Sequence, residues 1–140
     1  MALLSIIHYP DSRLHLKANP VTVFDANLQQ LVADMAQTMY HNDGIGLAAT
    51  QVDIQKRLFI MDLSKTDQPA NLLVFINPEI ISSSGEVIGE EGCLSVPGIY
   101  ESVLRFETIR LKYQDVNGMC HQLDCDGLMA VCIQHENDHL

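Results

Sequence analysis

Basic residues are scarce in this chain: 8 Lys and Arg stand against 18 Asp and Glu, which gives a formal net charge of -10 over 140 residues. The eight cationic residues are scattered, and no run of them could neutralise a row of phosphates. We therefore expect no direct binding to nucleic acid. The excess of acidic residues is interpreted as a solvated surface.

Long apolar runs are also absent, although 47% of the residues are hydrophobic. No segment approaches the roughly 18 apolar residues of a membrane span, so no membrane association is expected. The apolar residues 1–7 follow no basic residue and carry no small-residue cleavage pattern, which argues against a signal peptide. With no internal repeat, low-complexity segment or linker, residues 1–140 are predicted to form one cytoplasmic domain.

The sequence also lacks a C-x-x-C pair, and its four cysteines are Cys93, Cys120, Cys125 and Cys132. A reducing cytosol would keep them as thiols, which leaves Cys93 free to act as a thiolate. Cys132 lies in the apolar run of residues 128–133 and is interpreted as a packing residue.

The feature that carries chemistry is an H-E-x-x-H motif at residues 135–139. On a helix, His135 and His139 lie four residues apart on one face, so both imidazoles can reach one metal ion with Glu136 beside it. A hydrolytic site needs three protein ligands and an open position for water. Cys93 is the best candidate for the third ligand, because Glu90 and Glu91 precede it and Gly92 frees the backbone next to it.

Small residues dominate another segment, GIGLAATQ at residues 44–51. Glycine and alanine let the backbone come close to a ligand, and the amide of Gln51 can donate a hydrogen bond to a developing oxyanion. The segment lacks the G-x-G-x-x-G spacing and the lysine of phosphate-binding loops, so nucleotide binding is not supported.

Three segments together resemble the peptide deformylase family: GIGLAATQ at 44–51, EGCLS at 91–95 and QHENDHL at 134–140. They match, in order, the family patterns G-x-G-L-A-A-x-Q, E-G-C-L-S and Q-H-E-x-D-H-L. The resemblance extends to residues 7–11, 77–78, 96–98 and 126–128, and so spans nearly the whole chain. Most members continue past the second histidine, whereas this sequence stops one residue later, so we expect a C-terminally short member.

The resemblance implies a metal-dependent hydrolase that removes the formyl group from N-formylmethionine on nascent peptides and releases formate. Cys93, His135 and His139 would hold the divalent metal, with Fe(II) as the usual ion and Zn, Ni or Co able to occupy the same ligands. Glu136 would take a proton from the attacking water and pass it to the leaving amine. The Gln51 amide and the Leu94 backbone N–H would donate to the oxyanion.

Substrate recognition also follows from the resemblance. The Gly46 backbone would bind the formamide, and a methionine pocket would be lined by Ile45, Leu128, Val131, Cys132 and His135. The partners would be formylmethionyl ends of nascent chains at the ribosome, with weak direct affinity for the ribosome itself. Glu91 and Arg105 match an acid and a base of the family pattern; they are expected either to brace the Cys93 segment or to form an ordinary surface pair.

Three alternatives use the same residues differently. A zincin-type endopeptidase normally takes its third ligand downstream of H-E-x-x-H, where this sequence has none. A non-catalytic peptide-binding domain stapled by a metal would need a fourth ligand from Cys120, His121 or Cys125, and it gives Glu136 no role. A thiol-nucleophile enzyme would use Cys93 with a histidine and would not depend on metal.

The hydrophobic pattern predicts an α+β fold in which short antiparallel strands surround the metal-ligand helix. Asp25 is expected to cap a helix that ends near Gly44, and Asp126 to cap the final helix. The apolar stripe of the first helix is Leu28, Leu31, Val32, Met35 and Met39. Strands are predicted at 57–63, 72–76 and 108–114, with hairpin turn chemistry at Asn117-Gly118. The final helix is expected to pack Leu128, Val131, Cys132 and His135 against the sheet.

Overall fold

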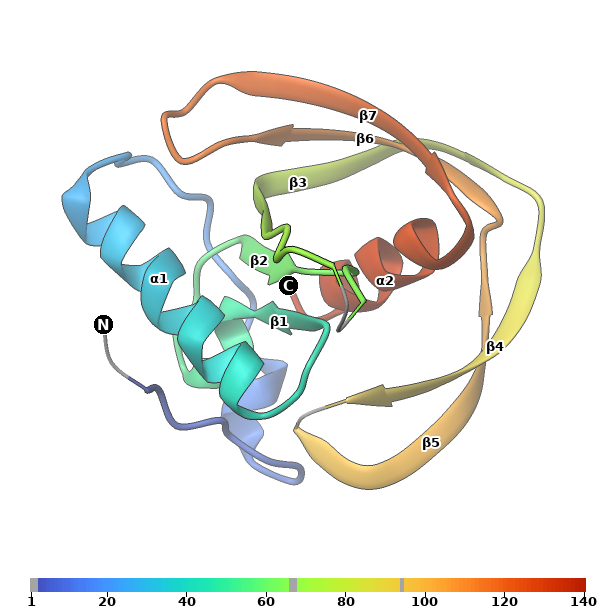
Figure 1. Ribbon diagram of the computed structural model, residues 1–140, viewed down its shortest axis with the longest axis horizontal. Coiled ribbons are helices and arrows are strands. Elements are labelled where there is room, and N and C mark those ends of the chain that lie inside the picture. Colours follow the sequence, from blue (N-terminus) through green and yellow to red (C-terminus); the bar gives the residue numbers. More distant parts are fainter. Residues whose placement is uncertain (1–2, 66–67, 94) are drawn as a thin grey trace.

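Two antiparallel sheets and two α-helices make up the computed structural model, which describes residues 3–65, 68–93 and 95–140 (Figure 1). The helical elements are η1 (Ser12–His15), α1 (Ala26–His41), η2 (Ala49–Val52) and α2 (Gly127–Asp138). The strands are β1 (Gly46–Ala48), β2 (Leu58–Met61), β3 (Leu73–Ser84), β4 (Val87–Cys93), β5 (Val96–Arg105), β6 (Thr108–Gln114) and β7 (Cys120–Asp126). No helix among these described residues is both long and apolar enough to cross a membrane.

Five strands form the larger sheet in the order β1-β2-β3-β6-β7, and β4 and β5 form a separate two-stranded ribbon between β3 and β6 in the chain. In Figure 1 the red helix α2 lies in the middle of the molecule, with the larger sheet on one side and the ribbon on the other. The predicted α+β fold, with antiparallel strands around the ligand helix, is therefore confirmed.

The predicted first helix is confirmed by α1. The Asp25 side chain accepts a hydrogen bond from the backbone N–H of Leu28, which satisfies one of the free donors of the first turn. After the helix, the Gly44 N–H donates to the Met39 carbonyl. The predicted stripe faces the core, with Leu28, Val32, Met35 and Met39 buried and Leu31 partly buried.

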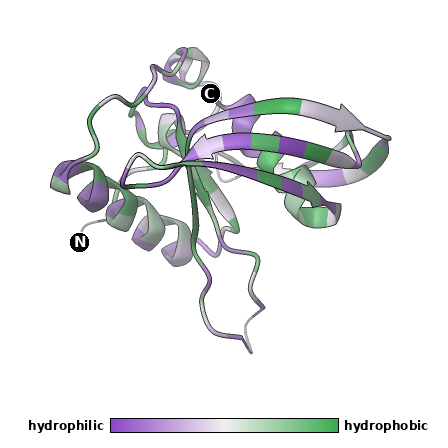
Figure 2. Cartoon of the chain, turned by 90° about the horizontal axis from the view of Figure 1, so that it is seen from above, coloured by the Kyte–Doolittle hydropathy of each residue, from purple (hydrophilic) through white to green (hydrophobic). Residues whose placement is uncertain are grey.

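The middle of the larger sheet is covered on both faces, which explains why β2 is apolar at every position. Leu58 and Ile60 pack into the hydrophobic cluster under α1, while Phe59 and Met61 pack into the cluster under α2. Successive side chains of a strand point to opposite faces, so a strand between two helices must be apolar throughout. In Figure 2, by contrast, hydrophilic and hydrophobic residues alternate along much of the sheet.

Two details of α2 differ from the sequence prediction. Asp126 precedes the helix, but its side chain makes no capping hydrogen bond; the chain enters α2 through the left-handed backbone of Gly127 (φ 58°). The face packed against the sheet carries Ala130 and Ile133 together with Cys132, which was predicted to lie there. The predicted residue Leu128 is instead 61% exposed. Apolar residues occur on more than one side of this helix, so its periodicity could not single out the packed face.

The strand predictions were confirmed for β2 and β6, and β6 has the predicted bounds. The strand predicted at 72–76 is β3, which continues to Ser84 through shifts in its pairing with β6. Such irregularities bend a strand and let it leave one sheet for another element. The ribbon of β4 and β5 was not predicted, because its exposed Gly and Glu residues are unfavourable in strands.

Candidate active site

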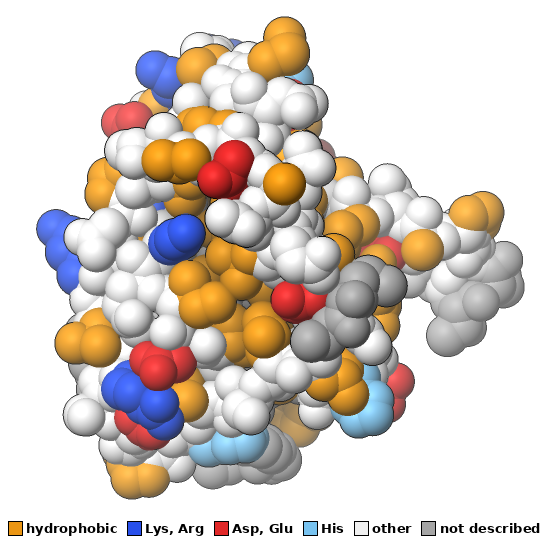
Figure 3. Space-filling view, turned by 90° about the vertical axis from the view of Figure 1, so that its left-hand side faces the viewer, with side chains coloured by type: hydrophobic (Ala, Val, Ile, Leu, Met, Phe, Trp, Pro, Cys, Tyr) orange, Lys and Arg blue, Asp and Glu red, His pale blue; other side chains and the backbone are white. Residues whose placement is uncertain are grey.

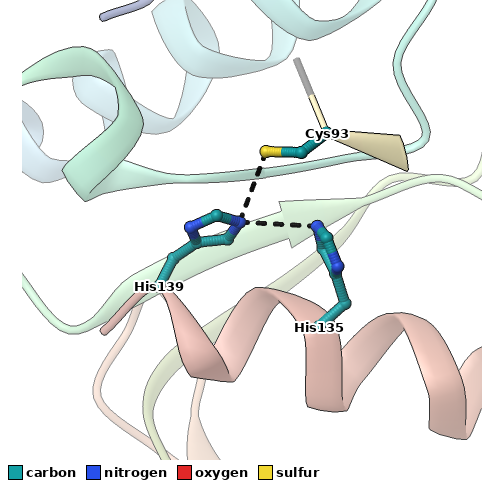
Figure 4. Close-up of side chains that lie close together, drawn as sticks. All are labelled: Cys93, His135 and His139. Atoms are coloured by element: carbon teal, nitrogen blue, oxygen red, sulfur yellow. Dashed lines mark hydrogen bonds between the residues drawn. The ribbon is translucent and has the colours of Figure 1, made fainter. Parts of the chain in front are cut away.

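Three side chains that lie far apart in the sequence converge beside α2 (Figure 4). His135 and His139 project from the last turns of α2, and Cys93 projects toward them from the end of β4. The Cys93 Sγ lies 3.6 Å from His139 Nε2, which lies 3.4 Å from His135 Nε2. Among the described residues, this is the group whose ligand atoms all lie within 4.8 Å of one another.

The two distances from His139 Nε2 fit a tetrahedral metal site. Bonds of about 2.3 Å from a metal to sulfur and about 2.0 Å to nitrogen separate neighbouring ligand atoms by roughly 3.3–3.5 Å. The sulfur–nitrogen and nitrogen–nitrogen distances of 3.6 Å and 3.4 Å are close to these values. One thiolate and two imidazoles are also a donor set suited to zinc or iron. The residues present therefore fit a divalent metal ion with one open position.

His135 is oriented by a carboxylate on the ribbon. Its Nδ1 lies 2.9 Å from Glu91 Oε1, an arrangement that keeps the proton on Nδ1 and leaves Nε2 available to a metal. Burial opposes the ionisation of Glu91, but hydrogen bonds from Arg105 and His135 outweigh it and lower the pKa of this carboxyl. Glu91 is thus an anion that holds the His135 ring in place.

Arg105 completes this network. Its Nη2 and Nε lie 2.7 Å and 3.0 Å from the two Glu91 oxygens, and its Nη1 donates to Asp138 at the end of α2. The side chains of Arg105 and Glu91 are only 11% and 10% exposed, so an ordinary surface pair is excluded. The pair joins β4, β5 and α2, and it braces the segment that carries Cys93.

His139 is partly buried at the end of α2. Burial, together with the nearby His135, lowers the pKa of His139 to about 4. The imidazole is therefore neutral at pH 7, and the neutral form is the one that binds a metal.

Glu136 is almost completely buried, with 3% of its surface exposed. Its Oε1 lies 3.8 Å from His135 Nε2, and its Oε2 has no hydrogen-bond partner among the described residues. Burial, with the negative charge of Glu91 adding to it, raises the pKa of Glu136 to about 8. A bound divalent ion would act in the opposite direction. A buried carboxyl with an unpaired oxygen beside a ligand group is typical of a proton-transfer residue.

Gly46 makes room for this carboxyl group. A Cβ atom at position 46 would come within 2.9 Å of Glu136 Oε2 and 3.0 Å of Glu136 Cδ. Any side chain there would displace Glu136, so position 46 of the GIGLAATQ segment is glycine for a steric reason.

Gln51 is held with its amide nitrogen toward the ligand group. Its Oε1 accepts from the Ala48 N–H at 2.9 Å, while its Nε2 lies 3.2 Å from both Cys93 Sγ and Ser95 Oγ. Gln51 is 1% exposed, so these contacts fix its orientation. The N–H of Leu94, the other predicted oxyanion donor, lies outside the described residues.

A cavity of about 830 Å³ opens onto this group. Its wall includes the following predicted site residues: Ile45, Gly46, Gln51, Cys93, Leu128, Val131, Cys132, His135 and Glu136. His139 belongs to the ligand group but is not part of the wall. Burial, with Glu136 and Glu91 nearby, raises the pKa of Cys132 to about 11, so this thiol stays protonated.

Several residues and contacts of the site were not predicted from the sequence. Leu3, Leu4 and Ile6 from the N-terminal segment border the cavity. The contact between Glu91 and His135 joins positions that are 44 residues apart, and no local pattern links them. A purely structural metal site would need a fourth ligand, for which His121 was one candidate. His121 is instead hydrogen-bonded to Asp115 near the β6–β7 turn.

Comparison with known proteins agrees with this geometry. A family model described as polypeptide deformylase matches residues 3–140. The chain belongs to the peptide deformylase family. It is 59% identical to a peptide deformylase from Chromobacterium violaceum, over 100% of this chain and 83% of that protein.

Solved structures of peptide deformylases share the fold. The enzyme from Thermotoga maritima superposes with a TM-score of 0.94 at 40% identity, covering 100% of this chain and 92% of the other. The enzyme from Synechococcus elongatus, solved in complex with actinonin, superposes with a TM-score of 0.94 at 46% identity, covering 98% of this chain and 75% of the other. Peptide deformylases are metal-dependent hydrolases that remove the formyl group from N-formylmethionine of nascent peptides, and this is the activity of the chain.

Proposed function

We propose that Cys93, His135 and His139 hold the metal and that Glu136 moves the proton during deformylation. The observation that carries this assignment is the convergence of the three ligand atoms within 4.8 Å of one another, with His139 Nε2 at tetrahedral spacing from both Cys93 Sγ and His135 Nε2. The unpaired Oε2 of buried Glu136 belongs to the same helix. The metal, when bound, supplies a Lewis acid that lowers the pKa of the attacking water and polarises the formyl oxygen.

Glu136 takes part in both halves of the reaction. Its carboxylate accepts a proton from water as the water oxygen attacks the formyl carbon, and it then donates that proton to the amine nitrogen as the C–N bond breaks. Formate and a free α-amino group result. The shape of the site supports this role, because Gly46 lets the carboxyl group lie directly against β1. Burial keeps bulk water from competing for the proton.

The remaining residues bind and orient the substrate in this proposal. The Gln51 Nε2 and the Leu94 backbone N–H donate to the oxyanion that forms on the formyl oxygen. The Gly46 backbone binds the formamide, and the methionine side chain enters the part of the cavity bordered by Leu128, Val131 and Cys132. Because residues 45–51, 91–95 and 128–139 all contribute, we propose that residues 1–140 act as one catalytic domain.

The assignment of Cys93 is tested by substitution. Cys93→Ser should weaken metal binding by at least about 10-fold, because the only thiolate of the proposed ligand group is lost. Cys120→Ser is the matched control: Cys120 is exposed at the start of β7, and its loss should leave metal binding unchanged. The metal content of both variants is measured after dialysis against a weak chelator. Equal loss of metal in both variants, or in neither, would contradict the assignment.

We further propose Fe(II) as the native metal, since a thiolate with two imidazoles accommodates iron and the family resemblance favours it. An iron-loaded sample exposed to air should then lose activity much faster than a nickel-loaded sample, because a thiolate on a redox-active ion is readily oxidised. Equal rates of decay would argue against iron-linked oxidation.

We also propose that the protein meets formylated nascent chains in the cytoplasm with weak direct affinity for the ribosome. The net charge of -10 opposes binding to ribosomal RNA, and on the face drawn in Figure 3 the Lys and Arg side chains lie as separate spots. Little protein should co-sediment with ribosomes at physiological salt. Tight binding that survives such salt would overturn this proposal.

A further inference from the structure

One buried hydroxyl group contacts the backbone of a proposed metal ligand. The Thr50 Oγ1 donates to the carbonyl oxygen of His139 at 2.8 Å, and Thr50 is 1% exposed. Thr50 lies in η2, 89 residues before His139 in the chain, so the contact joins two separate elements. This contact has no part in the reaction steps proposed above.

His139 is the C-cap of α2, where the helix leaves its last carbonyl groups without a partner inside the helix. A helix end frays readily unless another group donates hydrogen bonds to these carbonyl oxygens. The Thr50 hydroxyl donates to the His139 carbonyl oxygen here. Just beyond, the Ala18 N–H lies 3.4 Å from the Leu140 carbonyl oxygen, so the end of α2 is held by segments outside the helix.

The same short element also reaches the ligand on β4. Next to Thr50, Gln51 places its Nε2 3.2 Å from Cys93 Sγ. Consecutive residues of η2 therefore contact His139 through its backbone and Cys93 through its sulfur. Because the three ligand atoms must keep spacings near 3.5 Å, a small shift of the last turn of α2 would remove His139 Nε2 from the set.

We propose that Thr50 is a positioning residue for the metal site: its hydroxyl fixes the last turn of α2 so that His139 is held at ligand distance from Cys93 and His135. This inference depends on the proposed metal ligands. It predicts that loss of the hydroxyl speeds metal release, because His139 then leaves the metal more often, whereas the protein otherwise keeps its fold.

The test uses the Co(II)-loaded protein of residues 1–140 and follows the visible absorption of the bound ion after addition of excess EDTA. Thr50→Val and Thr50→Ala should release cobalt about 10-fold faster than the wild type or more. Thr50→Ser retains the hydroxyl and should release it at the wild-type rate. If Thr50→Val does not fold, the cobalt-release rates of Thr50→Ala and Thr50→Ser are compared instead to test the role of the hydroxyl.

Thr38 offers a matched control within the same protein. It is also fully buried, and its Oγ1 donates to the Asp34 carbonyl and accepts from the Leu4 N–H, both at 2.8 Å, so its hydroxyl bonds involve none of the three proposed ligands. Thr38→Val should lower the melting temperature without changing the rate of cobalt release. Equal release rates for Thr50→Val, Thr50→Ala and the wild type would overturn the proposal, as would a Thr38→Val variant as fast as Thr50→Val. A wild-type protein that bound no cobalt would instead contradict the metal site itself.

Discussion

Replacement of Glu136 by Gln is expected to lower kcat for formate release by about 10²–10⁴-fold, the range typical of a lost general acid–base residue. Gln has nearly the same shape, so it should fit the space beside Gly46, and the three ligand side chains should remain in place. The variant should therefore bind as much metal as the wild type. Only the group that carries the proton is lost.

Metal analysis and formate release from a formyl-methionyl peptide, measured on the same sample, check this expectation. Glu86→Gln is a suitable control, since Glu86 is exposed between β3 and β4 and the same change of charge there should leave kcat unaltered. Near-normal turnover in Glu136→Gln would rule out the proposed proton transfer. A loss of metal parallel to the loss of activity would show that Glu136 acts in metal binding instead.

Substitution of Glu91 by Ala should have the second largest effect, on both the metal and the fold. His135 Nδ1 would lose its acceptor, and such changes around a ligand typically weaken metal affinity by about 10–100-fold. Arg105, which is 11% exposed, would lose its bidentate partner and keep only Asp138, which is 64% exposed. Because Asp138 still compensates part of the Arg105 charge, the loss of folding stability should be smaller than that of a fully unpaired buried charge, about 2 kcal/mol.

Denaturant unfolding with metal removed separates the two effects of Glu91→Ala, because the loss of stability should persist without metal while the change in affinity appears only in titrations. The adjacent Glu90 is exposed on β4, so Glu90→Ala should alter neither quantity. If Glu91→Ala bound metal with unchanged affinity, Glu91 would have no part in orienting His135.

The sequence was sufficient where a local pattern determined the structure. The spacing of apolar residues after Asp25 predicted α1, and H-E-x-x-H placed His135 and His139 on one face of α2. It was insufficient where contacts between distant segments decide the outcome. The ribbon of β4 and β5 is stabilised by such contacts, including the link from Glu91 to α2, and its exposed Gly and Glu residues give no strand signal.

The packed face of α2 shows the same limit. Leu128 and Ile133 are both apolar, yet one borders the cavity and the other is buried in the core. Hydrophobicity alone cannot distinguish a substrate pocket from a core, because both are lined by apolar side chains. The resemblance to a known family, rather than periodicity, placed Leu128, Val131 and Cys132 at the pocket.

The most direct test of the proposed catalytic metal is a titration of chelated, anaerobically purified protein with Fe(II), in which formate release from a formyl-methionyl peptide is followed at each addition. We predict that activity is absent at the start and rises linearly to a break at one metal ion per chain, and that Cys93→Ser shows no such break. Formate release that survives chelation, or that is equally restored in Cys93→Ser, would contradict a catalytic metal held by Cys93, His135 and His139.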